Sequence, residues 1–253
     1  MDHIFPIVHV AGIRFDLATL TMIILTSIIV FVLAKLAVRN LSVTNPTKLQ
    51  NFLEWVIEFV QNIIGTSMDL KKGRPYLMLG ITLIMYIFVG DMLGLPIGIV
   101  TEAHHGASIF GMTLDLGGEE EAHIAWWKSP TADIGVTGAL TIIVILLTHI
   151  EGLRLNTKHY LKHYIEPHWG FLPLALIKEV SKPLSLALRL YGNIFAGEVM
   201  IGVILQLGIW GTPALVVWQG FSVFIGAIQA FVFCMLTMVY MSQAIVHEEH
   251  GEH

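Results

Sequence analysis

LATLTMIILTSIIVFVLAKLAV, residues 17–38, is an apolar stretch whose only charged residue, Lys35, lies near its C-terminal end. As a helix it would be about 33 Å long, which matches the roughly 30 Å hydrocarbon core of a bilayer. The residues before it lack the basic segment that opens a cleaved signal peptide, so we expect the stretch to be retained. It therefore predicts a first membrane-spanning helix.

Composition extends this prediction to the whole chain. Of its 253 residues, 55% are hydrophobic and 13% are charged, whereas soluble domains carry about 25% charged residues. The mean hydropathy is +0.73. A net charge of −5, without a dense cluster of Lys and Arg, argues against a nucleic-acid partner. The single cysteine, Cys234, excludes an intrachain disulfide and is expected to be a packing residue.

Four more apolar stretches are long enough to cross a bilayer, namely residues 76–100, 134–152, 173–207 and 214–246. The sequence therefore predicts one all-α integral membrane domain over residues 1–253, with five transmembrane helices.

The last two stretches are too long for a simple crossing, because each would form a helix about 50 Å long. One explanation is a non-spanning turn at Ser181-Lys182-Pro183, where a helix could start. The other is a steep tilt of both helices, which GIWGTP at residues 208–213 would join as a hairpin. We favour tilt for most of the length, although membrane helices average only about 20°.

Residues 47–74 follow a different pattern, with apolar side chains at helical spacing and Glu54 and Glu58 between them. This is typical of an amphipathic helix lying on a membrane surface.

Loop charge predicts the orientation of the chain in a cell inner (plasma) membrane. Basic residues gather between the first two spans and again after the third, whereas the intervening loop at residues 101–133 has one lysine and no arginine. Because basic loops stay in the cytoplasm, we expect the N-terminus outside and the C-terminus in the cytoplasm. The basic residues are Lys35, Arg39, Lys48, Lys71, Lys72 and Arg74, then Arg154, Lys158, Lys162, Lys178 and Lys182.

RLYGNIFAGE, residues 189–198, puts an arginine inside an apolar span, where a charge costs about 2.5 to 3.5 kcal/mol on insertion scales. Asn193 lies one turn from Arg189 on the same helix face, whereas Glu198 falls about half a turn round. Glu179 precedes the arginine by ten residues, about 15 Å along the axis. Arg189 is therefore predicted to lie between two carboxylates, and such charges are functional by default.

Polar residues also mark the last span, where Ser222, Gln229 and Tyr240 share one stripe. Three residues have ordinary structural interpretations beside a functional one. Asp91 could lie at an outer helix end that is exposed to water. His149 could be a packing histidine, and Tyr240 could anchor its helix at the membrane interface.

KPLSLALRLYGNIFAGE at residues 182–198 and IQAFVFCMLTMVYMSQAIVHEEH at residues 228–250 resemble the a subunit of F-type ATP synthases, the membrane stator against which a ring of c subunits turns. The resemblance covers nearly the whole chain. It implies that Arg189 is the essential arginine facing the rotor carboxylate. The positions of Asn193, Glu198 and Gln229 would belong to the ion path.

This resemblance also implies a mechanism and a set of partners. Two offset half-channels would open around Glu179 and Glu198 on opposite sides of the membrane, and the rotor's own ligands would select proton or sodium. Some relatives carry a histidine where Ser222 stands, so water or Glu198 would relay the proton here. The implied partners are the c-subunit ring, the b-subunit peripheral stalk, the rest of the ATP synthase complex and lipid. No cofactor and no catalytic site of its own are expected.

Two other classes of protein fit the sequence less well. A secondary ion-coupled transporter would be built from paired inverted repeats, but the first half holds no second arginine motif. An intramembrane hydrolase would need a motif such as GxSxG or HExxH, and neither occurs. The C-terminal HEEHGEH lacks the spacing of a zinc site, so no metal site is predicted.

Overall fold

The computed structural model describes residues 6–10, 13–94, 100–104, 108–109, 112–113, 121–165 and 172–245. Within them, five helical segments are long and apolar enough to cross a membrane. The prediction of an all-α integral membrane protein is therefore confirmed. The long helices are α1 (Leu17–Ala37), α2 (Lys48–Ser67), α4 (Leu77–Gly94), α5 (Ile134–Ile165), α6 (Leu172–Leu205) and α7 (Thr212–Ile245).

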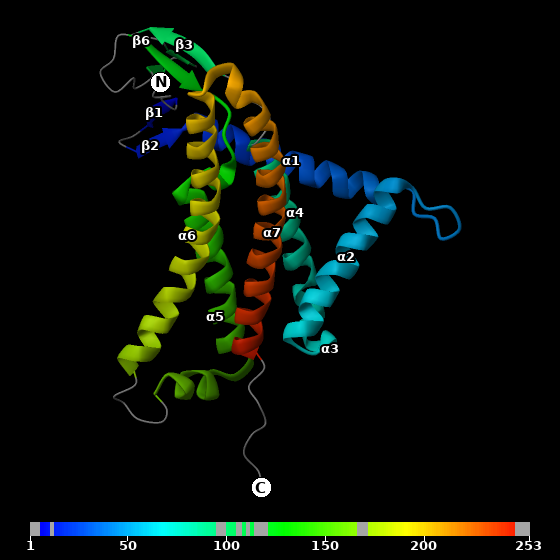
Figure 1. Cartoon of the computed structure of the whole chain (residues 1–253). Helices are drawn as coiled ribbons and strands as arrows, with labels where there is room; N and C mark the ends of the chain where they lie inside the picture. The colour runs from blue at the N-terminus through cyan, green and yellow to red at the C-terminus, as the bar shows by residue number, and fades with distance from the viewer. Residues whose placement is uncertain are drawn as a thin grey trace.

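Short elements connect these helices. They are helix α3 (Leu70–Gly73) and the 3₁₀ turns η1 (Arg74–Tyr76), η2 (Pro130–Ala132) and η4 (Gly208–Gly211). Three antiparallel strand pairs add β1 (Ile7–Val10) with β2 (Ile13–Asp16), β3 (Val100–His104) with β6 (Glu121–Ala125), and β4 (Ser108–Ile109) with β5 (Met112–Thr113). Figure 1 shows β1, β2, β3 and β6 gathered at the end of the bundle where α6 meets α7.

One predicted boundary is wrong. The second span was expected to reach residue 100, but α4 ends at Gly94 and Val100 begins β3. The third was expected at residues 134–152, close to the apolar span Ile134–Leu155, although helix α5 continues to Ile165. Hydropathy marks the length of chain that suits a membrane, and a helix extends past it wherever the following residues favour helix.

Local sequence explains where the first helices begin. The Asp16 carboxylate accepts hydrogen bonds from the backbone N–H groups of Ala18 and Thr19, which caps α1. The Thr47 hydroxyl caps α2 in the same way by accepting from Gln50 N. The amphipathic pattern of α2 is also confirmed, because Val56 and Val60 are buried while the opposite side is exposed.

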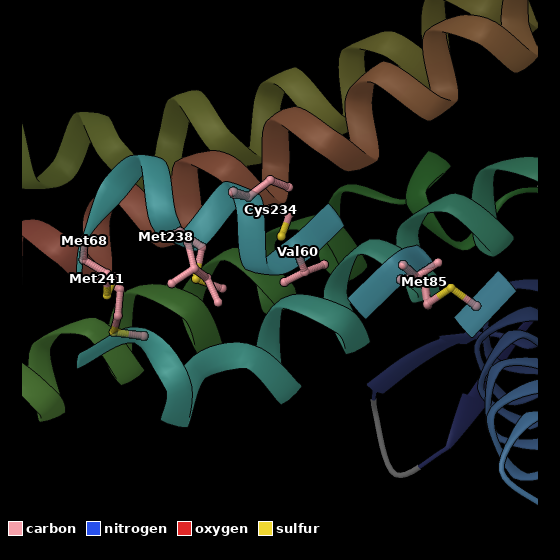
Figure 2. Close-up of a cluster of buried hydrophobic side chains, with 9 residues drawn as sticks. Val60, Met68, Met85, Cys234, Met238 and Met241 are labelled. Atoms are coloured by element: carbon pink, nitrogen blue, oxygen red, sulfur yellow. The ribbon is translucent and has the colours of Figure 1, made fainter. Parts of the chain in front are cut away.

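The larger packed cluster joins α2, α4 and α7 (Figure 2). Val60, Met85, Cys234 and Met238 are buried in it, so the packing role predicted for the cysteine is confirmed. Gly80 of α4 lets the helices approach, because a Cβ there would lie 2.6 Å from Val60 Cγ1 and 2.9 Å from Met238 Cε. Small residues serve this purpose between membrane helices.

A second cluster fixes the position of α6. Leu186 and Leu190 of α6 are fully buried against Ile87 of α4, Val144 of α5 and Phe233 of α7. These contacts hold the segment that carries the intramembrane arginine.

The last two helices form the expected hairpin. They are joined by η4, which Gly208 enters with a φ of 61°, a conformation that favours glycine. Each contains 34 residues, about 51 Å of helix, and α6 runs through Pro183 without a break. The alternative of a separate turn at residues 181–183 is therefore wrong.

The direction of α1 differs from that of the two long hairpin helices. Figure 1 shows α1 running across the direction of α6 and α7, not along it. With 21 residues, α1 is about 32 Å long and matches the hydrocarbon thickness when upright. The hairpin helices and α1 cannot therefore both stand along the membrane normal, and the steep tilt of the hairpin stays a prediction.

Candidate functional site

A cavity of about 130 Å³ lies where α4, α6, α7 and the segment before α5 meet. It brings together four residues that the sequence singled out: Asn193 and Glu198 of α6, Ser222 of α7 and Asp91 of α4. Ser129 and Trp218 also line it, and Trp218 Nε1 donates to the carbonyl of Gly197 at 3.3 Å, which ties the two hairpin helices together beside Glu198. The Glu198 side chain is exposed in the isolated chain.

Asp91 is completely buried, with 0% of its surface exposed. The interpretation as a helix end exposed to water is therefore wrong. One carboxylate oxygen, Oδ1, accepts from the Thr131 hydroxyl at 2.5 Å, and Ser129 Oγ lies 2.5 Å from Thr131 Oγ1. Ser129 Oγ also donates to the carbonyl of Gly90 at 3.1 Å. A chain of hydroxyl groups thus leads from the segment before α5 to the buried carboxyl group.

Three buried polar atoms near this carboxyl group have no hydrogen-bond partner among the described residues: Asp91 Oδ2, Ser222 Oγ and Gln229 Nε2. Ser222, Gly226 and Gln229 share one face of α7, and a Cβ at Gly226 would lie 3.3 Å from Asp91 Cβ. An unpaired buried polar group is costly, and ordered water usually satisfies such groups. The seam between α4 and α7 is therefore suited to hold water next to the cavity.

Arg189 lies one helical turn from Asn193, on the N-terminal side of the cavity. Its neighbours Leu186 and Leu190 are buried in the bundle, whereas Arg189 itself is exposed. Among the described residues no carboxylate is within ion-pair distance of it, as the half-turn offset of Glu198 predicts. The guanidinium, which stays charged at all relevant pH values, is left available to a group from outside the chain.

Glu179 belongs to a second polar group near the N-terminal end of α6. Its Oε1 accepts from Lys182 Nζ at 2.6 Å, and its Oε2 lies 3.7 Å from His149 Nε2 of α5. The Lys182 ammonium is 5.6 Å from the centre of the Tyr240 ring of α7. Glu179, His149 and Tyr240 are therefore close together, and Arg189 lies between this group and the cavity.

The segment Trp126–Asp133 contains contacts that the sequence did not reveal. Trp127 Nε1 donates to the carbonyl of Leu93 at 2.6 Å, and Lys128, which is 7% exposed, forms a 2.6 Å ion pair with Asp16. Nothing in the sequence indicates that the Trp127 ring bonds the end of α4. The sequence feature that could have pointed to the ion pair is Lys128 itself, because it is the single Lys or Arg of a long loop.

No group of His, Cys, Asp and Glu that could hold a metal ion occurs among the described residues. The C-terminal HEEHGEH lies outside them.

Comparison with known proteins assigns a family to this arrangement. The model of the ATP synthase A chain family matches residues 19–242. ATP synthase subunit a of Anoxybacillus flavithermus is 46% identical over 98% of this chain and 100% of that protein. The same subunit of Bacillus subtilis and that of Staphylococcus carnosus are each 44% identical over 98% of this chain and 100% of the relative. The chain belongs to the ATP synthase A chain family.

Proposed function

We propose that the chain is the ion-translocating stator subunit of a rotary ATP synthase, with the proton as its ion. Family membership and five membrane helices support this assignment over a secondary transporter. The observation that carries it is the position of Arg189 on α6 between two separate polar groups, where it forms no ion pair with any of the described residues. The subunit works as part of the ATP synthase complex and has no catalytic site of its own.

Arg189 acts on a carboxyl group that the c-subunit ring carries past it. In contact with lipid that carboxyl group must be neutral, because an ionised carboxylate in hydrocarbon is costly. Opposite a guanidinium the ionised form is favoured, so the rotor releases its proton there. The fixed positive charge also blocks direct proton flow between the two polar groups. Because each charge that crosses gains about 2.3 kcal/mol per 100 mV, the membrane potential biases rotation.

The cavity forms the outer half-channel. Asn193, Glu198 and Ser222 line it, and the buried seam with Asp91 and Gln229 extends it with water. Ser222 cannot carry a proton as an imidazole does, so Glu198 and water relay it. Glu198, which is exposed on the surface of the chain, transfers the proton to the rotor.

The group around Glu179 forms the cytoplasmic half-channel. It lies on the other side of Arg189, near the basic start of α6. With the N-terminus outside and the C-terminus in the cytoplasm, loop charge assigns this end of the hairpin to the cytoplasm. The remaining partners are the b-subunit peripheral stalk and the lipid of the plasma membrane. The whole chain, residues 1–253, acts as one membrane domain.

Arg189→Ala tests the proposal in the assembled complex. ATP-driven proton pumping into inverted membrane vesicles is expected to be abolished, while the amounts of a, b and c subunits in the purified complex stay unchanged. Arg189→Lys is expected to rescue poorly, because a lysine lacks the planar guanidinium and its charge is more easily lost when buried. Wild-type pumping by an assembled Arg189→Ala complex would exclude the proposed mechanism.

A further inference from the structure

His149 has an environment that a packing histidine does not need. It stands on α5 within the apolar span Ile134–Leu155, and its side chain is 36% exposed. Nδ1 lies 2.9 Å from the carbonyl oxygen of Ile145, one turn earlier, and Nε2 lies 3.7 Å from Glu179 Oε2. The ring therefore has one nitrogen on its own helix and the other directed at a residue of the proposed ion path.

The contact with Ile145 fixes which nitrogen carries the proton in the neutral ring. A carbonyl oxygen can only accept a hydrogen bond, so Nδ1 must be the donor. The lone pair of the neutral ring then lies on Nε2, which faces Glu179. Histidine is also the side chain whose charge changes between about pH 5 and 8. His149 is thus oriented to accept a proton from Glu179.

Glu179 is arranged to use only one of its oxygens for this exchange. Oε1 is held by the Lys182 ammonium at 2.6 Å, which leaves Oε2 on the side of His149. Among the described residues, the titratable groups near the pair include Lys182 of α6 and Tyr240 of α7. On α5 itself, Glu151 accepts from the Tyr76 hydroxyl at 3.1 Å and lies 3.7 Å from Arg154.

We propose that His149 is the proton carrier that follows Glu179 on the cytoplasmic route, an inference that rests on the proposed function. The O–H bond at Glu179 Oε2 breaks, an N–H bond forms at His149 Nε2, and a carboxylate faces an imidazolium. The Nε2 proton then passes to water at the exposed edge of the ring, which restores the neutral imidazole. A separation of 3.7 Å is closed by one bridging water or a small side-chain shift. Proton uptake from the cytoplasm uses the same steps in reverse.

The experiment measures passive proton flux through the complex in vesicles stripped of its soluble ATPase part, driven by a potassium diffusion potential. His149→Ala is expected to slow the flux about tenfold. This loss is smaller than is typical when a general acid or base is removed, because water replaces part of the relay. Imidazole added at millimolar concentration on the cytoplasmic side is expected to restore the rate. His149→Gln keeps a polar side chain of similar reach but cannot carry a proton, so it is expected to be as slow as alanine.

Two controls separate a proton carrier from a structural residue. Ile150→Ala, at an exposed neighbour on α5, is expected to conduct at the wild-type rate. Imidazole is expected not to accelerate Glu179→Gln, because there the preceding proton donor is missing.

Several outcomes would overturn the inference. Wild-type flux in either His149 variant, or a slow alanine variant that imidazole does not restore, would return His149 to a packing role. If His149→Ala fails to assemble, the flux through the glutamine variant decides. Loss of ATP-driven pumping in Arg189→Ala together with wild-type passive flux in His149→Gln would reject this inference alone. Normal ATP-driven pumping by an assembled Arg189→Ala complex would reject the proposed function.

Discussion

Lys128 Nζ lies 2.6 Å from Asp16 Oδ2, so an ion pair joins two residues 112 positions apart at the start of α1 and before α5. The same aspartate caps α1, and its Oδ2 also accepts from the Thr19 hydroxyl at 2.8 Å. Lys128 is only 7% exposed, with Asp133 Oδ2 at 3.5 Å as a second carboxylate. This pair holds the segment before α5 in place on the bundle. Ser129 of that segment lines the cavity.

Asp16→Asn is expected to destabilise the protein. The amide keeps an oxygen that can cap the helix, but it removes the closer of the two carboxylates that Asp16 and Asp133 place at the buried ammonium. We expect a loss of about 1–3 kcal/mol in unfolding free energy, because removing one partner of a buried hydrogen bond has about that cost. The measurement is the Tm of the detergent-purified complex, read from dissociation of this subunit. Asp69→Asn, at the exposed cap of α3, is the matched control and is expected to change the Tm much less. Equal Tm values for the two variants would show that the ion pair contributes nothing measurable.

The same pair predicts a pH dependence. Burial by itself raises the pKa of Asp16, but the hydrogen bond and charge of Lys128, with the bonds from Thr19, outweigh it and hold that pKa below its usual value. A carboxyl group with a lowered folded-state pKa stabilises the fold above its unfolded pKa of about 3.9 and loses this contribution as the pH falls through the folded value. The Tm difference between wild type and Lys128→Met is therefore expected to be constant from pH 5 to 8 and to shrink below about pH 4. A difference that shrank between pH 8 and 6 would assign the effect to another group.

Gly80 provides a test of the packing between α2, α4 and α7. In Gly80→Ala the new Cβ would meet the short, stiff side chain of Val60 at 2.6 Å, so the helices must separate slightly. Such overpacking typically costs about 1–3 kcal/mol. The expected result is a lower Tm and a lower yield of assembled complex, partly restored by adding Val60→Ala. Gly138→Ala on α5 is the control, since a Cβ there meets nothing within 4 Å and is expected to be neutral. A neutral Gly80→Ala would contradict the close approach.

The sequence was sufficient to predict the helices but not all of their ends. Spans are set by the thickness of hydrocarbon, which converts directly into a number of apolar residues. Pro183 is a strong helix breaker in water, yet α6 continues through it, because neighbouring helices can stabilise the backbone groups that a proline leaves unpaired. The alternative of a turn at residues 181–183, which we favoured less than tilt, is wrong for this reason.

The site was predictable only where its residues share a helix. Helical spacing related Arg189, Asn193 and Glu198, since a rise of 1.5 Å per residue fixes their separation. The burial of Asp91 and its bond from Thr131 were not predictable, because they arise from a loop that folds back onto α4. The contact between His149 of α5 and Glu179 of α6 was not predictable either, because the spacing of residues along one helix does not show which residues of another helix lie beside it.

The two half-channels can be tested by the side from which each carboxylate position is reached. Glu198 borders the cavity and Glu179 belongs to the group on the other side of Arg189, so one continuous water column past all three would dissipate the gradient. In a Cys234→Ala background, Glu198→Cys is expected to react with impermeant thiol reagents added to intact cells. Glu179→Cys is expected to react only in inverted vesicles. This result would also fix the orientation of the hairpin.

Transport by the corresponding amides completes the test. Glu198→Gln is expected to reduce proton pumping at least tenfold, because an amide cannot carry a proton, and Glu198→Asp is expected to retain part of it. Glu179→Gln is expected to have a smaller effect than Glu198→Gln, since water from the nearby interface can replace part of its role. The matched control is Ser181→Ala, an exposed position whose hydroxyl only bonds its own helix at Ile177. Labelling of both cysteines from one side would exclude two separate routes. Full pumping in Glu198→Gln would exclude them as well, because a carboxyl group that transport does not need cannot be the relay between the cavity and the rotor.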